Sequence, residues 1–294
     1  MSTHARRDRY FPWKICDLFP RWSSVSIARL SETNKRSKPI PTISVQSLTG
    51  CAGELLVILE NLQKMLPYVR IQSFPFAQSK NSDEPVDITF VEGSVSNPHD
   101  LEKLRAIRLR SKRVVAVGNC AVWGCVQKGA CSRLAVEEMR NQVYGAESKI
   151  EVMPASRIED HVQVDVKLSG CPIDSTQLLA VAASMLKDHL PYVTKKPVCL
   201  ECKLRENPCI LIEQDLPCLG PVTAAGCGAL CPSVGAPCYG CWGPSEEAQM
   251  DAMANVLMEK GFSLKEILTR LQAFGAPPEL FTRLNQLQDQ ADSN

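Results

Sequence analysis

Apolar and polar residues follow two different rhythms between residues 42 and 195. Short apolar runs typical of buried β-strands recur along this stretch, at residues 43–48, 69–74, 86–91, 113–117 and 162–168. Helical patterns lie between or after them, at residues 55–66, 98–109 and 178–190. Ser175 is expected to cap the last helix. Strands and helices in alternation predict an α/β domain with an open parallel sheet covered by helices.

Three further segments flank this domain of residues 42–195. Residues 196–245 are rich in Cys, Pro and Gly, and we expect them to lack a hydrophobic core and to be organised by metal. Residues 246–294 return to helical periodicity. Residues 1–41 form a basic extension with nine Lys/Arg, three Asp/Glu and five aromatic residues. We interpret the extension as an arm that docks on a partner subunit, or alternatively as a loosely held basic tail.

The overall charge excludes several classes of partner. The chain carries 33 basic and 32 acidic side chains, a formal net charge of +1, which argues against nucleic acid or an anionic membrane. No apolar run approaches the roughly 20 residues of a transmembrane segment. The N-terminus lacks the apolar region of a secretory signal, so a cytoplasmic location is predicted. Gly-x-Gly-x-x-Gly and Walker motifs are also missing, which argues against nicotinamide or flavin binding by this chain.

Fourteen cysteines are the unusual feature of the composition. In a cytoplasmic chain, short-spaced cysteines indicate metal ligation rather than disulfides. Cys51, Cys120 and Cys171 each follow a predicted strand. Because parallel strands present their carboxyl ends at one edge of the sheet, these three residues are expected to converge there.

Eight further cysteines lie between Cys199 and Cys241 and divide into two groups of four by spacing. Four thiolates are the ligand set of one cubane iron–sulfur cluster. Two four-cysteine zinc sites are the alternative, but such sites usually contain two Cys-x2-Cys pairs each, and each group here has one. The spacing therefore favours iron–sulfur clusters.

Several motifs resemble one protein family. Residues 217–223 (Pro-Cys-Leu-Gly-Pro-Val-Thr), Cys227 and residues 237–241 (Pro-Cys-Tyr-Gly-Cys) resemble the small, electron-transferring subunit of [NiFe] hydrogenases. Residues 118–121 and 169–172 resemble the loops that hold its proximal cluster. The resemblance spans residues 42–245, and the first domain is also similar to the 20-kDa-type subunit of respiratory complex I.

One part of the cysteine-rich segment narrows the resemblance to a branch of that family. Residues 199–203 (Cys-Leu-Glu-Cys-Lys), together with Cys231, most resemble the delta subunits of cytoplasmic NAD(P)-linked sulfhydrogenases. In exported relatives the first distal ligand is a histidine, whereas this chain has Cys199 at that position.

The resemblance implies a flavodoxin-like sheet domain, an irregular iron–sulfur domain and C-terminal helices, with three [4Fe-4S] clusters. It implies a proximal set at the sheet edge, consisting of Cys51, Glu54, Cys120 and Cys171. The implied distal set is Cys199, Cys202, Cys209 and Cys218. The implied medial set is Cys227, Cys231, Cys238 and Cys241. The implied partners are a large subunit with a nickel–iron site and diaphorase subunits that carry flavin and iron–sulfur clusters.

Glu54 departs from the family pattern, which has Cys-x-x-Cys where this chain has Cys51-Ala-Gly-Glu54. A carboxylate can bind iron but is a harder ligand than a thiolate. Glu54 is therefore expected as the fourth ligand. As an alternative, Glu54 serves only the positive end of a helix. The cluster would then have three cysteine ligands, or Cys125 would complete it, or the site would be empty or degraded.

The sequence thus predicts an iron–sulfur subunit of a cytoplasmic [NiFe] hydrogenase. It would relay electrons between a large subunit and an NAD(P)-reactive module without bond chemistry of its own. One alternative is the same relay in a nickel-free assembly that reduces sulfur or quinone. Another is an interaction protein stapled by zinc.

Overall fold

The structure is a computed structural model that describes residues 39–131, 135–189, 191–274, 283–284 and 286–287. Predictions about the N-terminal extension therefore concern residues that lie, except for its last three, outside the described part. Pro41–Asn294 is one compact unit that contains both the sheet and the cysteine-rich region. In the described residues, no helix is long and apolar enough to span a membrane.

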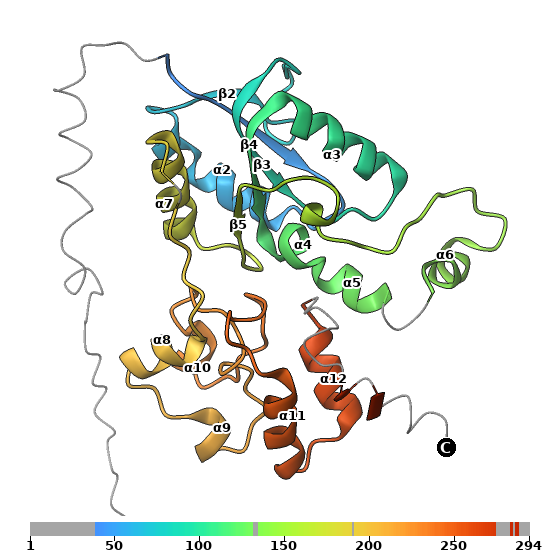
Figure 1. Ribbon diagram of the computed structural model, residues 1–294, viewed down its shortest axis with the longest axis vertical. Coiled ribbons are helices and arrows are strands. Elements are labelled where there is room, and N and C mark those ends of the chain that lie inside the picture. Colours follow the sequence, from blue (N-terminus) through green and yellow to red (C-terminus); the bar gives the residue numbers. More distant parts are fainter. Residues whose placement is uncertain (1–38, 132–134, 190, 275–282, 285, 288–294) are drawn as a thin grey trace, which may run out of the picture. The chain divides into compact units, whose positions relative to one another are not determined.

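A five-stranded parallel sheet forms the first part of this unit (Figure 1). Its strands are β1 (Thr42–Ser47), β2 (Arg70–Ser73), β3 (Val86–Glu92), β4 (Ser111–Val117) and β5 (Val166–Leu168). They lie in the order β2-β1-β3-β4-β5, and every neighbouring pair is parallel. The predicted α/β class is confirmed.

Helical segments lie between and after the strands. They are α2 (Gly53–Met65), α3 (Pro98–Arg110), α4 (Gly118–Trp123), α5 (Cys125–Cys131), α6 (Val136–Tyr144), the 3-10 turn η2 (Ile158–Asp160) and α7 (Ser175–Leu186). Helices α2, α3 and α7 pack on the faces of the sheet, whereas α6 buries no side chain. Ile58 of α2 and Leu178 of α7 are buried in one apolar cluster with Val115 of β4. Leu104 of α3 packs in another cluster with Val114, the next residue back on the same strand. Successive strand residues point to opposite faces, so one apolar run supplies two cores.

Three predicted boundaries differ from the structure, and a side chain takes a backbone role at the first two. The strand expected from residue 162 begins at Val166, because the Asp165 carboxylate accepts a hydrogen bond from the Val114 N–H at 2.8 Å. Helix α7 is capped by Asp174, whose side chain accepts from the Gln177 N–H, and Ser175 is its first residue. The helix ends at Leu186, four residues earlier than predicted.

The cysteine-rich region contains short helices and a hydrophobic core. Its helices are α8 (Val198–Leu204), α9 (Ile210–Glu213) and α10 (Leu230–Ser233), followed by α11 (Met250–Glu259) and α12 (Leu264–Gln272). Val198, Leu219 and Val222 are buried in one cluster with Leu257 of α11 and Leu271 of α12. The expectation that this region lacks a core was wrong, because the C-terminal helices supply the other half of it.

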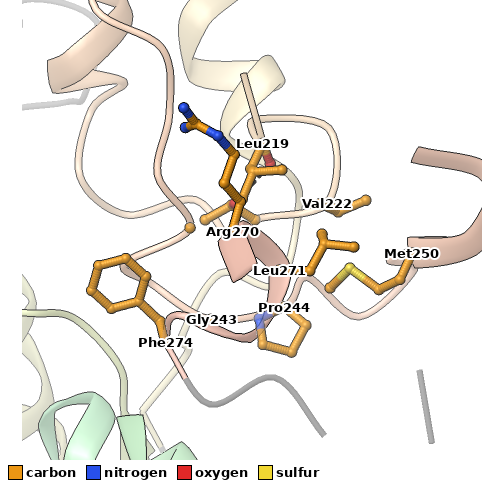
Figure 2. A pocket seen from close by; sticks show the side chains of 10 residues that line it. Leu219, Val222, Gly243, Pro244, Met250, Arg270, Leu271 and Phe274 are labelled. Atoms are coloured by element: carbon orange, nitrogen blue, oxygen red, sulfur yellow. Dashed lines mark hydrogen bonds between the residues drawn. The ribbon is translucent and has the colours of Figure 1, made fainter. Parts of the chain in front are cut away.

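A small apolar pocket lies where the cysteine-rich loops meet these helices (Figure 2). Leu219 and Val222 line it together with Met250 and Leu271. The guanidinium of Arg270 on α12 lies 5.7 Å from the ring centre of Tyr239, within the range of a cation–π contact. Since Tyr239 directly follows Cys238, α12 contacts a loop that carries predicted ligands.

Candidate metal centres

Three predicted ligands converge at the carboxyl edge of the sheet. Cys51 follows β1, Cys120 lies on α4 directly after β4, and Cys171 follows β5. The Gly53 N–H donates to the Cys51 thiol and favours its thiolate, but burial and the charges of nearby groups, Cys120 and Cys171 among them, raise its pKa overall. The structure therefore brings together three thiols that are far apart in sequence.

Asn119 holds two of these loops in place from a fully buried position. Its backbone N–H donates to the Gly170 carbonyl at 2.8 Å, and its Oδ1 accepts from the Gly170 N–H at 3.1 Å. Its Nδ2 donates to the carbonyl oxygen of Cys241 at 2.7 Å. One side chain thus joins the loop of Cys171 to the cysteine-rich region.

Cys125 belongs to the same edge and is 1 % exposed. Its thiol hydrogen-bonds to the sulfurs of Cys120 and Cys171, so it lies between two members of the proximal set. That hydrogen bond lowers the pKa of Cys171 to about 7. The two hydrogen bonds raise the pKa of Cys125, and burial and the charges of Cys120 and Cys171 act in the same direction. The proximal region therefore holds four thiols rather than three.

Glu54 is in the first turn of α2 and is 2 % exposed. Burial raises the pKa of its carboxyl to about 7, and the nearby charges of Glu92 and Cys171 raise it further. Its side chain hydrogen-bonds to that of Glu92, which is itself buried at the end of β3. Oxygen Oε2 of each carboxyl has no hydrogen-bond partner. Two carboxyl groups therefore face each other beside the thiols.

The distal set gathers around α8. Cys199 and Cys202 are on that helix, and Cys209 directly precedes α9. Burial raises the pKa of Cys199 to about 11, and the nearby charges of Cys218, Cys202 and Cys209 add to the shift. A Cβ at Gly220 would lie 3.4 Å from the Cys199 sulfur and 3.5 Å from that of Cys218. All four predicted distal ligands are together, in a space that a side chain at position 220 would narrow.

The medial set lies between the other two. Burial raises the pKa of Cys241 to about 12, with further contributions from Cys227, Cys231 and, from the proximal set, Cys171. Burial also raises the pKa of Cys238 to about 12, and the neighbouring charges of Cys218 and Cys241 act in the same direction. The Cys238 N–H donates to the Cys218 sulfur at 3.2 Å. The charge of Cys171 in the proximal set thus acts on Cys241, and Cys238 contacts Cys218 of the distal set.

Glu201 connects the distal and medial ligands although it is not a predicted ligand. It lies on α8 between Cys199 and Cys202. Its two carboxylate oxygens accept hydrogen bonds from the Gly226 N–H at 3.0 Å and the Ala229 N–H at 3.2 Å. Those two residues flank Cys227 and Gly228, so the carboxylate clamps the loop of a medial ligand to the helix of two distal ones.

The donor chemistry of all three sets fits thiolate-bound iron. The twelve cysteines of the three regions are free thiols. Thiolates in fours are the usual ligands of [4Fe-4S] clusters. Burial that raises the pKa values of thiols disfavours free thiolates, so a bound cation is what would keep them ionised.

Comparisons with known proteins show the family to which the chain belongs. Residues 49–185 match the family model described as NADH ubiquinone oxidoreductase, 20 Kd subunit. The chain is 40% identical over 226 residues to sulfhydrogenase 2 subunit delta of Pyrococcus furiosus, covering 76% of this chain and 94% of that protein. The chain belongs to this family of hydrogenase subunits.

Other members of the family are also similar. A subunit of the F420-non-reducing hydrogenase vhu of Methanocaldococcus jannaschii is 32% identical, over 82% of this chain and 96% of that protein. The NAD-reducing hydrogenase HoxS subunit delta of Cupriavidus necator is 28% identical, over 48% of this chain and 75% of that protein. The chain is therefore a hydrogenase small subunit of the iron–sulfur type, one part of a multi-subunit oxidoreductase.

Sequence reasoning missed Asn119, Glu92 and Glu201 as residues that support this small subunit's sites. Glu92 had a readable signal, because it ends a strand whose neighbours deliver predicted ligands to the same edge. Asn119 and Glu201 act through hydrogen bonds to residues 122 and 25 positions away, which no local pattern reveals.

Proposed function

We propose that this small subunit carries electrons through proximal, medial and distal [4Fe-4S] clusters of a cytoplasmic [NiFe] hydrogenase. The observation that carries the proposal is the continuity of the three ligand sets. Cys171 and Cys241 link the proximal to the medial set, and Cys238 and Cys218 link the medial to the distal set. Clusters bound at these sets would supply one-electron carriers in a row.

The exposure of the ligands supports an electron path that begins and ends at the protein surface. The three sets contain eleven cysteines, and Cys125 is the twelfth in these regions. Of these twelve, only Cys51 and Cys209 are exposed. One belongs to the proximal set and the other to the distal set, so both ends of the row reach the surface, whereas the medial cysteines are buried or half-buried. A relay needs this arrangement, because it exchanges electrons with partners only at its ends.

The two exposed ends call for two partners. We assign the edge with Cys51 to the large subunit and its nickel–iron site. We assign the surface with Cys209 to a diaphorase module that carries flavin and iron–sulfur clusters and reacts with NAD(P). The resemblance of residues 199–203 to the NAD(P)-linked branch supports that acceptor, as does the name of the NAD-reducing relative.

Metal analysis of the purified complex tests the proposal. We expect about twelve irons and a matching amount of sulfide per small subunit, the count for three cubane clusters, together with nickel in the large subunit. Iron without nickel would place the same relay in a nickel-free assembly and refute the hydrogenase. Zinc in place of iron would refute the relay itself.

A variant tests the role of the medial set. Cys238→Ala should lose the medial cluster and interrupt H2-dependent reduction of NAD(P), while H2-dependent reduction of an artificial dye near the proximal end continues. Cys131→Ala, at a cysteine outside the three sets, is the matched control and should leave both activities unchanged. NAD(P) reduction at the parent rate in Cys238→Ala would contradict the assigned order.

A further inference from the structure

We propose that the indole N–H of Trp242 donates a hydrogen bond to a sulfur of the medial cluster and raises the reduction potential of that cluster. The inference rests on the proposed function, since it assumes that the medial set binds a [4Fe-4S] cluster. Hydrogen bonds to the sulfurs are one of the means by which a protein sets the potential of such a cluster.

The backbone brings Trp242 to the start of a second ligand loop. Trp242 directly follows Cys241, the last ligand of the medial set. An antiparallel β-bridge joins Pro244, two residues further on, to Thr223. The chain that leaves Trp242 is therefore held beside the chain that leads to Cys227, the first medial ligand.

The indole nitrogen of Trp242 is buried next to that first ligand. Trp242 is 8 % exposed, and its Nε1 atom is buried without a hydrogen-bond partner among the described residues. A Cβ at Gly226 would lie 2.6 Å from this nitrogen, and Gly226 directly precedes Cys227. The N–H thus lies between the neighbours of two medial ligands, with no acceptor supplied there by the described chain.

A buried indole N–H needs an acceptor. The indole nitrogen can only donate a hydrogen bond, and almost all buried polar groups in native proteins are hydrogen-bonded. Leaving such a donor unpaired is costly, so the missing acceptor calls for an explanation. A cluster at the medial set would supply sulfur acceptors beside Cys227, where the Trp242 nitrogen lies.

The amide of Gln177 on α7 is the alternative partner within the chain. Its Nε2 atom lies closer still to the position of a Cβ at Gly226, and its Oε1 is buried without a partner. An amide NH2 donates and does not accept, so in this orientation it offers Trp242 nothing. Rotation of the amide by half a turn would bring its oxygen there, and the experiment has to distinguish this pairing from a cluster sulfur.

The sign of the effect follows from charge. The reduced cluster carries one more electron than the oxidised one, so a donor N–H stabilises the reduced form more. Trp242→Phe keeps an aromatic ring but removes the N–H, and the medial cluster should then be harder to reduce. We expect the equilibrium constant for its reduction to fall about tenfold, which is about 59 mV for a one-electron couple. The proximal and distal potentials should not change.

The test uses the whole complex, purified without oxygen, and compares the parent with Trp242→Phe and Tyr239→Phe. Potentials are measured by redox potentiometry followed by EPR, and iron is counted in each sample. Tyr239 is the matched control, because it lies in the same loop, is 50 % exposed and keeps a ring beside Arg270 when its hydroxyl is removed. Tyr239→Phe should retain all three potentials.

A spectroscopic measurement on the parent complex keeps the proposal testable even if Trp242→Phe fails to assemble. In a complex labelled with 15N at the indole nitrogens, pulsed EPR of the reduced medial cluster should show a 15N coupling. Where Trp242→Phe does assemble, it should lose this coupling and keep about twelve irons. A merely structural tryptophan would give neither result.

Three outcomes would overturn the proposal: no 15N coupling to the medial cluster in the parent, an unchanged medial potential in Trp242→Phe, or an equal shift in Tyr239→Phe. The first two are expected if the indole pairs with Gln177 or with a buried water. Failure of the proposed function looks different, because a parent complex with far fewer than about twelve irons would contradict the three-cluster relay itself. About twelve irons together with one of the three outcomes would refute only the donor.

Discussion

Asn119 offers a direct test of how the sheet domain and the cysteine-rich region are joined. Its buried side chain makes two hydrogen bonds, one from the Gly170 N–H and one to the Cys241 carbonyl. Gly170 precedes a proximal ligand, and Cys241 is itself a medial ligand. Asn119→Ala would remove both hydrogen bonds without adding a larger group, so it loosens the contact between neighbouring cluster sites.

The size of the effect follows from the two partners left behind. Each buried backbone group that loses its hydrogen bond costs about 1–3 kcal/mol, so the two together cost about 2–6 kcal/mol. If opening of this contact limits cluster loss, even 2 kcal/mol raises the rate by about 30-fold, because about 1.4 kcal/mol corresponds to a factor of ten. The backbone hydrogen bond between Asn119 and Gly170 remains, so the protein should still assemble.

The assay follows the visible absorbance of the clusters in the purified complex at a fixed elevated temperature. Asn119→Ala should lose this absorbance at least tenfold faster than the parent. Asn141→Ala is the matched control, because Asn141 is exposed and its side-chain oxygen accepts hydrogen bonds from its neighbour Arg140. Equal rates for the parent and Asn119→Ala would refute the view that this side chain joins the two regions.

Two further predictions concern a close approach and a core. Gly118→Ala should impair folding of the proximal site far more than Gly145→Ala, because both glycines have similar left-handed φ values but only the Cβ at 118 would clash with the Glu54 carboxyl. Equal yields and melting temperatures of the two variants would contradict this. Leu257→Ala should lower the free energy of unfolding by about 2–5 kcal/mol, whereas Val256→Ala, on the more exposed face of α11, should have little effect. If chemical denaturation shows equal effects, the cysteine-rich region does not depend on this core.

Local pattern was sufficient to predict the sheet, and it also proposed most of the candidate ligands. A buried strand needs apolar residues whichever fold it joins, so β1, β3 and β4 could be read from the sequence, and the edge where Cys51, Cys120 and Cys171 meet followed from the parallel arrangement. Cysteine spacing likewise assigned Cys199, Cys202, Cys209 and Cys218 to one set, and the charges of the other three act on the pKa of Cys199 in the structure.

Only the tertiary structure decided which groups stand beside those ligands. The sequence placed Glu54 in the ligand position of a motif, but its contact with Glu92, 38 residues away, depends on how α2 packs against the end of β3. Cys125 reaches Cys120 and Cys171 through two left-handed residues, and their backbone angles leave no signal in hydrophobic periodicity. The core of the cysteine-rich region was likewise hidden, because half of its apolar side chains come from α11 and α12. Such contacts depend on long-range packing, whereas a sequence pattern reports only what neighbouring residues require.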